Sequence, residues 1–223
     1  MEYSPALPIV LSLRVAATAL VIVAPLGIAL AYVQARREYA LRGVVDALVL
    51  LPLVLPPTVV GYFLILLAGR RGFLGVWLES LFGIRIVFTP TAAVIASAVA
   101  ALPLLVRTVQ PALEAVPAEL EAIGRSLGLS PIAVFFRVTL PWAWRGVAAG
   151  LVLAFARAIG EFGATLMFAG NIPGRTNTMP LEIFAAYQAA DDQRALLYVA
   201  VLTIISAVVV FMASRLAPRE SRG

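Results

Sequence analysis

Two charged residues, Arg157 and Glu161, lie four positions apart toward the end of an apolar stretch of the chain. On a helix this spacing brings a guanidinium and a carboxylate onto one face, where they can form an ion pair. Charges at membrane depth are costly, and they are usually paired or face a cavity. The two residues therefore either neutralise each other, or Arg157 offers positive potential to a passing anion. A fully exposed arginine would hold a dianion too tightly for turnover, because conduction needs weak sites.

The residue types on which most enzymes depend are missing. The 223 residues include no histidine and no cysteine, and all 17 basic residues are arginine. This excludes disulfides, imidazole or thiolate metal sites and histidine-based catalysis. A phosphate-binding P-loop requires a lysine, so any ATP must be bound by another subunit. We expect no catalytic residues, no metal site and no bound cofactor in this chain, and no nucleic acid partner.

The composition is that of a membrane protein. Hydrophobic residues make up 62% of the chain and charged residues 13%, whereas soluble domains carry about 25% charged residues. A transmembrane helix needs about 20 mostly apolar residues. Five stretches satisfy this requirement: about Pro8–Gln34, Val44–Leu67, Thr91–Val109, Gly146–Gly170 and Ala195–Leu216. We therefore predict an all-α polytopic protein with about five transmembrane helices and a single domain over residues 1–223.

The arginines predict the orientation. An odd number of spans places the termini on opposite sides, and positive residues are enriched in cytoplasmic loops. With the N-terminus outside, nine loop arginines lie inside and five lie outside, which favours this orientation and a cytoplasmic C-terminus. The inner set is Arg36, Arg37, Arg42, Arg125, Arg137, Arg145, Arg215, Arg219 and Arg222, and the outer set is Arg70, Arg71, Arg85, Arg175 and Arg194.

Prolines interrupt the second span at Pro52, Pro56 and Pro57. Proline breaks the hydrogen-bond ladder, so this helix is kinked or interrupted and must be shielded by its neighbours. It is either a bent packing helix or a gate on a translocation pathway. The tentative pathway residues are Pro56, Pro57, Arg157, Gly160, Glu161, Gly163 and Thr165.

A ridge of small residues on the fourth span repeats every four positions, at Gly146, Gly150, Ala154 and Ala158. Such a ridge lets another helix approach closely. The partner is either a helix of the same subunit or the central helix of a second copy.

A polar segment between the third and fourth spans, within residues 110–145, predicts two short helices. Pro117 suits a first helical turn, and Gly128 is placed to end that helix in the left-handed conformation. Leu120, Ile123 and Leu127 form one apolar stripe, and Glu121 and Arg125 form a pair on the polar side.

The second short helix begins at Ser130-Pro131 and is expected to end at Leu140-Pro141. We call residues 117–141 the elbow. It is either a docking knob for a soluble partner or a helix pair that lies on the lipid headgroups.

Two loops predicted to lie outside carry donors and positive charge but few acids. The run Asn171–Thr178 suits contact with an anion or an acidic protein surface, although an outer turn has the same composition. The loop Ala68–Pro90 carries arginines beside apolar residues that can lie in the interface. The outer-loop candidates are Arg70, Arg71, Asn171, Pro173, Gly174 and Thr176.

The elbow resembles the cytoplasmic loop of the permease subunits of binding-protein-dependent ABC importers. The matching residues are Glu121-Ala122, Gly128 and Val138-Thr139-Leu140-Pro141, whereas Ile123 and Gly124 stand where alanines are usual. In that family the short helix sits in a cleft of the ATPase subunit and transmits its movements. The implied coupling residues are Glu119, Glu121, Ala122, Arg125, Gly128, Leu140 and Pro141.

Other segments resemble the molybdate branch of these importers, over roughly Leu11 to Arg215. They are Phe155–Thr165, Gly170–Thr176, Leu51–Tyr62 and Gly69–Phe73. The resemblance implies a second copy of the chain, two ATPase subunits that bind ATP and Mg, and an extracytoplasmic protein that delivers molybdate or tungstate. It also implies the plasma (inner) membrane of a bacterium or archaeon, and Arg70 and Arg71 are expected to meet an acidic face of the binding protein.

Three alternatives remain at this stage. Sulfate and thiosulfate permeases share a similar Gly-Glu-Phe-Gly stretch, here Gly160–Gly163. A secondary transporter would need intramembrane acids or two matched halves, and Glu161 is the one acid clearly available. A membrane enzyme would need a catalytic constellation, which this composition does not supply.

Overall fold

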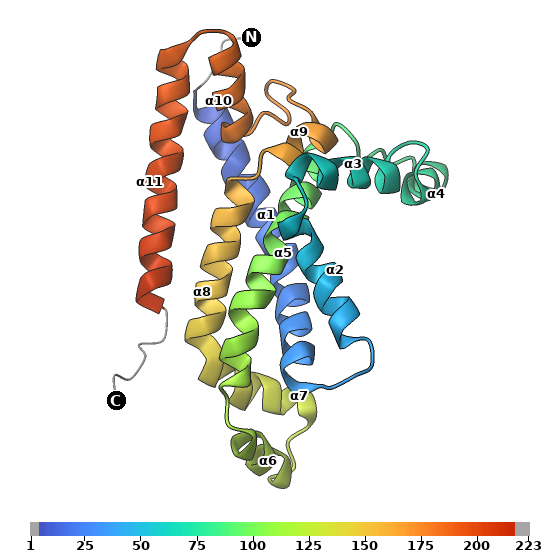
Figure 1. Ribbon diagram of the computed structural model, residues 1–223, viewed down its shortest axis with the longest axis vertical. Coiled ribbons are helices and arrows are strands. Elements are labelled where there is room, and N and C mark those ends of the chain that lie inside the picture. The colour runs from blue at the N-terminus through green and yellow to red at the C-terminus, as the bar shows by residue number, and fades with distance from the viewer. Residues whose placement is uncertain (1–4, 217–223) are drawn as a thin grey trace.

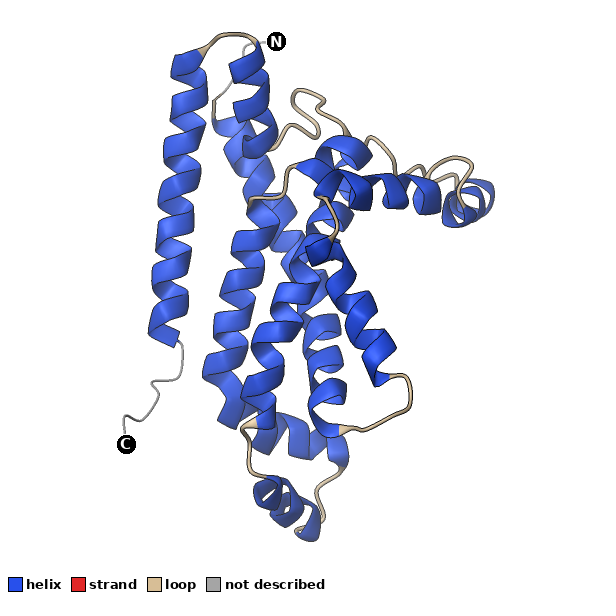
Figure 2. Ribbon diagram, viewed as in Figure 1, coloured by secondary structure: helices blue, strands red, loops and turns tan. Residues whose placement is uncertain are grey.

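The computed structural model describes residues 5–216, so Arg219 and Arg222 of the predicted inner set lie outside the described residues. Every regular element in this range is helical (Figure 2), which agrees with the predicted all-α class. The helices are α1 (Ala6–Arg36), α2 (Arg42–Val54), α3 (Pro57–Ala68), α4 (Phe73–Phe82), α5 (Pro90–Glu114), α6 (Ala118–Ser126), α7 (Pro131–Val134), α8 (Leu140–Ile159), α9 (Gly163–Ala169), α10 (Met179–Gln188) and α11 (Asp192–Leu216).

Four continuous helices are long and apolar enough to cross a membrane: Ala6–Arg36, Pro90–Glu114, Pro131–Ile159 and Asp192–Leu216. Helices α2 and α3 are together long and apolar enough for a fifth span, but they are bent by 116° where the chain passes Leu55 and Pro56, as in a broken span or a re-entrant loop. The predicted number of spans is therefore reached only when this broken pair counts as one. The start of α1 and the end of α11 lie at opposite ends of the bundle (Figure 1), as an odd number of crossings requires.

Helix α5 forms the centre of the bundle, with α1 and α8 packed against it (Figure 1). Small residues allow this close approach. A Cβ added at Gly146 would lie 2.2 Å from Ala112 Cβ, and one at Gly150 would lie 2.7 Å from Val109 Cγ2. The small-residue ridge of α8 therefore packs inside the subunit, and this face is not available for the seam with a second copy.

The predicted fourth span, Gly146–Gly170, has the wrong boundaries. Helix α8 ends at Ile159, and the chain turns through Gly160–Phe162 before α9 begins at Gly163. At its other end α8 continues without interruption from α7, so one apolar helix runs from Pro131 to Ile159, although its first turns lie across the end of the bundle (Figure 1). The reason for this continuity lies in a widened turn, described below.

Helix α10 falls in a region that the sequence analysis treated as loop. Its first turn contains Pro180, and this is the usual place for a helical proline. The backbone N–H of Met179 donates to Ser12 Oγ of α1 at 2.7 Å, which fixes the start of α10 against the bundle. Helix α10 then leads directly into α11.

Candidate functional sites: the elbow and two facing helix breaks

The elbow projects from the end of the bundle opposite the N-terminus (Figure 1). The predicted turn at Gly128 and the predicted helix start at Ser130 are confirmed, whereas Pro117 lies just before the first helix rather than in its first turn. Gly128 adopts a left-handed φ of +84° after α6, and the hydroxyl of Ser130 accepts from the N–H of Ala133 at 3.3 Å at the start of α7. These two residues turn the chain sharply between the two short helices.

The predicted end of the second helix at Leu140-Pro141 is wrong. Residues Phe135–Thr139 form a π-helical turn, in which the N–H of Leu140 donates to the carbonyl of Phe135. The wider turn carries the helix past Pro141, whose missing N–H would otherwise break the ladder. The second helix of the elbow and the transmembrane helix α8 are therefore parts of one helix.

Glu121 faces the bundle and is only 4% exposed. Its Oε1 atom accepts from Arg36 Nε at 3.1 Å and from the hydroxyl of Thr139 at 2.7 Å. Arg36 Nη2 also donates to the carbonyl of Val116 at 2.9 Å. The predicted partner Arg125 lies farther away, with 3.9 Å between its Nη1 and Glu121 Oε2. We call the contact of Arg36, Glu121 and Thr139 the Arg36 clamp.

Two residues of the predicted apolar stripe of α6 point outward, whereas the third, Leu120, is half-buried. Ile123 is 57% exposed and Leu127 is 78% exposed, whereas Glu121 and Gly124 are buried. The Arg36 clamp sets this orientation, and Gly124 permits it, because a Cβ there would lie 3.3 Å from Val134 Cγ2. We call the four exposed residues Ile123, Leu127, Ile132 and Phe136 the elbow apolar surface.

The break between α2 and α3 and the break between α8 and α9 lie against each other. A Cβ added at Gly163 would lie 2.7 Å from Pro57 Cβ and 3.3 Å from the backbone nitrogen of Thr58. Farther along the same pair of helices, a Cβ at Gly61 would lie 2.7 Å from Met167 Cβ. The structure thus brings together the proline and glycine groups that the sequence analysis assigned to the pathway.

Arg157 and Glu161 form the expected ion pair at the α8–α9 break. Arg157 Nη1 lies 2.7 Å from Glu161 Oε2, with side-chain exposures of 26% and 1%. The other carboxylate oxygen accepts from the N–H of Ala164 at 2.8 Å and thereby caps α9. Nearby, the hydroxyl of Thr165 is buried and has no hydrogen-bond partner among the described residues. This geometry favours mutual neutralisation, with part of Arg157 still accessible.

The donors of Asn171–Thr178 hold the loop itself together. Asn177 Nδ2 donates to Asn171 Oδ1 at 2.6 Å, and Ile172 N–H donates to the buried hydroxyl of Thr176 at 2.9 Å. Pro173 and Gly174 lie exposed at the tip. Contact with another molecule is therefore restricted to the tip of this loop.

The arginines after α3 are partly neutralised within the chain. Glu79 of α4 accepts from Arg85 Nε at 2.9 Å and lies 3.6 Å from Arg70 Nε. Arg71 is exposed. Helix α4 extends sideways from the bundle (Figure 1) and carries exposed apolar residues, including Phe73 and Trp77.

The contact of Arg36 and Thr139 with Glu121 was not predicted from the sequence. Arg36 had been counted only as an inner-loop charge, and Thr139 only as part of the loop motif. Arg36 lies 85 positions from Glu121, so no local spacing connects them. The sequence indicated only that Arg36, in the last turn of an apolar helix, needs a partner or water. It did not indicate which residue that partner is.

The fold matches a solved importer. The chain superposes on a subunit of the inward-facing MetNI methionine ABC transporter with a TM-score of 0.65 and 20% identity, covering 95% of this chain and 91% of that one. The family model described as the binding-protein-dependent transport system inner membrane component matches residues 23–222, and the chain belongs to this family.

Within this family, the chain is similar to permease proteins of molybdenum transport systems. The molybdenum transport system permease protein ModB of Escherichia coli (strain K12) is 41% identical over 214 residues, covering 96% of this chain and 93% of that protein. The protein of the same name from Haemophilus influenzae is 43% identical over 200 residues, covering 88% and 87%. The chain is therefore similar to these permeases over nearly its whole length.

Proposed function

We propose that this chain is the membrane subunit of an ATP-driven importer of molybdate, with tungstate as a second substrate. Similarity to the molybdenum permeases over 96% of the chain supports the substrate. The chain works as a pair of copies with two ATPase subunits, which bind the ATP and Mg, and with an extracytoplasmic binding protein that delivers the anion. It lies in the inner membrane with the N-terminus outside and the elbow inside.

The elbow apolar surface is the observation that carries the coupling role. Exposed apolar patches on an otherwise polar projection mark contact sites for other proteins, and Ile123 and Phe136 are exposed on both parts of the elbow. Lipid contact accounts for exposed apolar residues along the spans, but α6 lies beyond the ends of the spanning helices (Figure 1). We therefore assign this surface to the ATPase subunit. On the opposite side of α6, Glu121 binds Arg36 of α1 and thereby fixes the orientation of the elbow apolar surface.

The facing helix breaks are the proposed gate. Non-helical backbone at membrane depth is tolerated where it is buried in protein or lines a cavity. Gly163 packs against Pro57, whereas Pro56 and Gly160 are exposed, as expected of breaks that line a pathway. ATP closes the ATPase subunits, the elbows move, and the breaks separate so that the pathway opens toward the binding protein. Differential contact of the elbow with two ATPase states couples these events.

The Arg157–Glu161 pair suits transient passage of a dianion. Glu161 cancels most of the charge of Arg157, and the exposed part of the guanidinium leaves a weak attraction. Weak sites release an ion quickly, whereas an unpaired arginine would retain it.

Uptake into proteoliposomes tests the proposal. The vesicles contain this chain with its ATPase and binding protein, and labelled molybdate is offered with and without ATP. We expect ATP-dependent uptake that unlabelled tungstate inhibits and sulfate does not. Inhibition by sulfate would assign the chain to sulfate import, and uptake without ATP would contradict the importer itself.

A further inference from the structure

A groove of about 500 Å³ lies between α5, α8 and α11, on the half of the bundle that carries the elbow. Its volume is in the range of about 300–1,000 Å³ that is typical of ligand pockets. The walls are almost entirely apolar and include Ala112 and Ala115, Gly146 and Ala149, and Val210 and Ala213. A groove with such walls accepts a hydrocarbon chain rather than a polar ligand.

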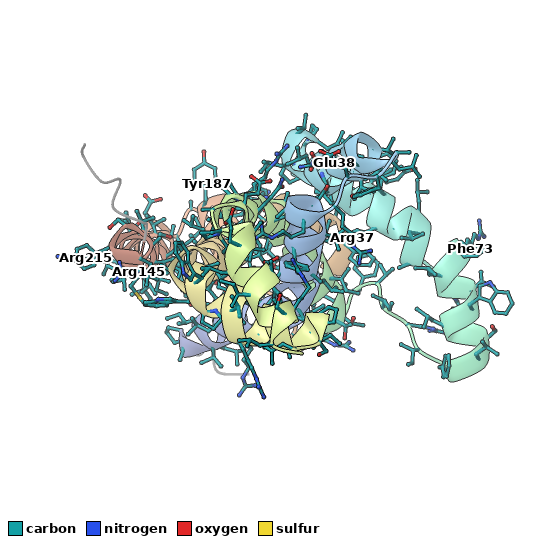
Figure 3. All side chains as sticks on the ribbon, turned by 90° about the horizontal axis from the view of Figure 1, so that it is seen from below. Arg37, Glu38, Phe73, Arg145, Tyr187 and Arg215 are labelled. Carbon is teal, nitrogen blue, oxygen red and sulfur yellow. The ribbon has the colours of Figure 1, made fainter. Side chains whose placement is uncertain are left out.

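Two arginines stand beside this groove. Arg145 directly precedes the lining residue Gly146, and Arg215 directly follows the lining residue Ser214. Figure 3 shows both side chains next to each other at one edge of the molecule. Neither forms an ion pair within residues 5–216.

Aromatic rings hold both guanidinium groups in place. Arg145 Cζ lies 5.7 Å from the ring centre of Trp144, and Arg215 Cζ lies 4.9 Å from that of Phe211. Stacking on a ring leaves the N–H edges of a guanidinium free to bind an anion. The neighbouring Trp142 and Trp144 are exposed, and exposed tryptophans mark the depth of the lipid headgroups. The unpaired charges are therefore at the level where lipid phosphates lie.

We propose that this groove holds an acyl chain of an anionic phospholipid, whose phosphate is bound by Arg145 and Arg215. The inference depends on the orientation given under the proposed function, which places the elbow end in the cytoplasmic leaflet, where anionic lipids attract basic residues. The two features act together, because the groove fits the chain of the lipid and the arginines select its headgroup.

Charge favours a lipid over a second copy of the chain as the occupant. The chain carries a net charge of +5, so a second copy would on average bring more positive charge. Of its acids at this end, Glu121 and Glu114 pair with Arg36 and Arg42. Glu38, which forms no ion pair among the described residues, lies on the other side of the bundle from Arg145 and Arg215 (Figure 3). The exposed Glu119 on the elbow likewise has no ion pair in this range. A phospholipid phosphate has no such competing partner.

Lipid retention by the assembled transporter tests the proposal. The complex of this chain with its ATPase is reconstituted in vesicles of equal parts phosphatidylglycerol and phosphatidylcholine, extracted in mild detergent, and weighed by native mass spectrometry. We expect preferential retention of phosphatidylglycerol, reduced roughly fivefold by Arg145→Gln or by Arg215→Gln. The control is Arg37→Gln, which removes an exposed arginine on the other side of the bundle (Figure 3) and should change nothing.

Equal retention of both lipids would overturn the proposal, as would an equal loss in the Arg37→Gln control. A crosslink identifies the occupant directly. The chain has no cysteine, so Ser214→Cys carries a single benzophenone label at the groove. We expect its photoproduct to be a lipid adduct, and a product with the second copy would contradict the proposal. Neither measurement uses transport, so failure here is distinguishable from failure of the uptake experiment.

Discussion

The guanidinium of Arg36, at the end of α1, lies 3.0 Å from the buried carboxylate of Glu121 in the elbow. The contact joins two segments that are 85 residues apart, and it turns the acidic residue of the elbow toward its own subunit. Glu121 therefore holds the elbow in position, while Ile123 and Leu127 are left exposed on the outer side of α6.

The Arg36 clamp predicts a large effect of a single charge. Arg36→Gln leaves Glu121 buried without its cation, and breaking a buried pair in this way costs about 3–5 kcal/mol. Unfolding in detergent should show a loss near the lower figure, because Arg36 is partly exposed. The double variant Arg36→Gln with Glu121→Gln should regain more than half of it. Arg37→Gln is the control, and an equal loss there would mean that the clamp contributes nothing.

The elbow apolar surface predicts a loss of assembly without a loss of folding. Ile123→Ser and Phe136→Ser alter exposed residues, so the free energy of unfolding should change by less than about 0.5 kcal/mol. Affinity for the ATPase should fall by roughly 30-fold for the pair, as expected for central apolar contacts worth about 2 kcal/mol. The matched control is Phe73→Ser, which removes an exposed aromatic residue far from the elbow. Unchanged affinity in the elbow variants would place the ATPase elsewhere.

Two glycine-to-alanine changes should act in opposite directions. In Gly163→Ala the new Cβ meets Pro57 at 2.7 Å, and overpacking of this kind costs about 1–3 kcal/mol. Gly43 in α2 has nothing within 4 Å of its added Cβ, so Gly43→Ala should stabilise the helix by up to about 1 kcal/mol. Uptake should fall at least about tenfold in the first variant only, because the helix breaks can no longer close. Normal uptake by Gly163→Ala would argue against a gate at this contact.

The Arg157–Glu161 pair predicts two kinds of transport defect. Glu161→Gln leaves Arg157 unneutralised, so the anion should be held longer: the maximal uptake rate falls about tenfold, and labelled molybdate stays with the purified complex. Arg157→Gln leaves a buried negative charge that repels the anion, so uptake falls without retention. Rapid filtration of the loaded complex separates the two cases. If both variants release molybdate at the same rate, the pair lies outside the pathway.

Features that depend on neighbouring residues were predictable from the sequence. Ser130 and Gly128 cap and end the elbow helices as expected, because a cap is decided within four residues. The Arg157–Glu161 pair was predictable for the same reason. The proline-rich break of the second span also follows directly from Pro56 and Pro57.

Features that depend on distant contacts were not. The face that α6 presents is decided by its contact with Arg36, 85 positions away, and this contact leaves Ile123 and Leu127 exposed. The continuity through Pro141 required a π-helical turn, which has no sequence rule comparable to a cap. Thr176 was predicted to be available to a partner, but its hydroxyl accepts from Ile172 and donates to the carbonyl of Gly170 within the loop.

Helix α8 has 20 residues from Leu140 to Ile159, which corresponds to a rod about 30 Å long at 1.5 Å per residue, whereas the preceding α7 lies across the end of the bundle (Figure 1). One end is held by the elbow, and the other ends at the break beside Pro57. Over this length a tilt of roughly 5° at the elbow displaces the far end by about 2.6 Å, close to the length of a helical backbone hydrogen bond. Under the proposed coupling, α8 acts as a lever arm that turns a small rotation of the elbow into a displacement of the helix break beside Pro57.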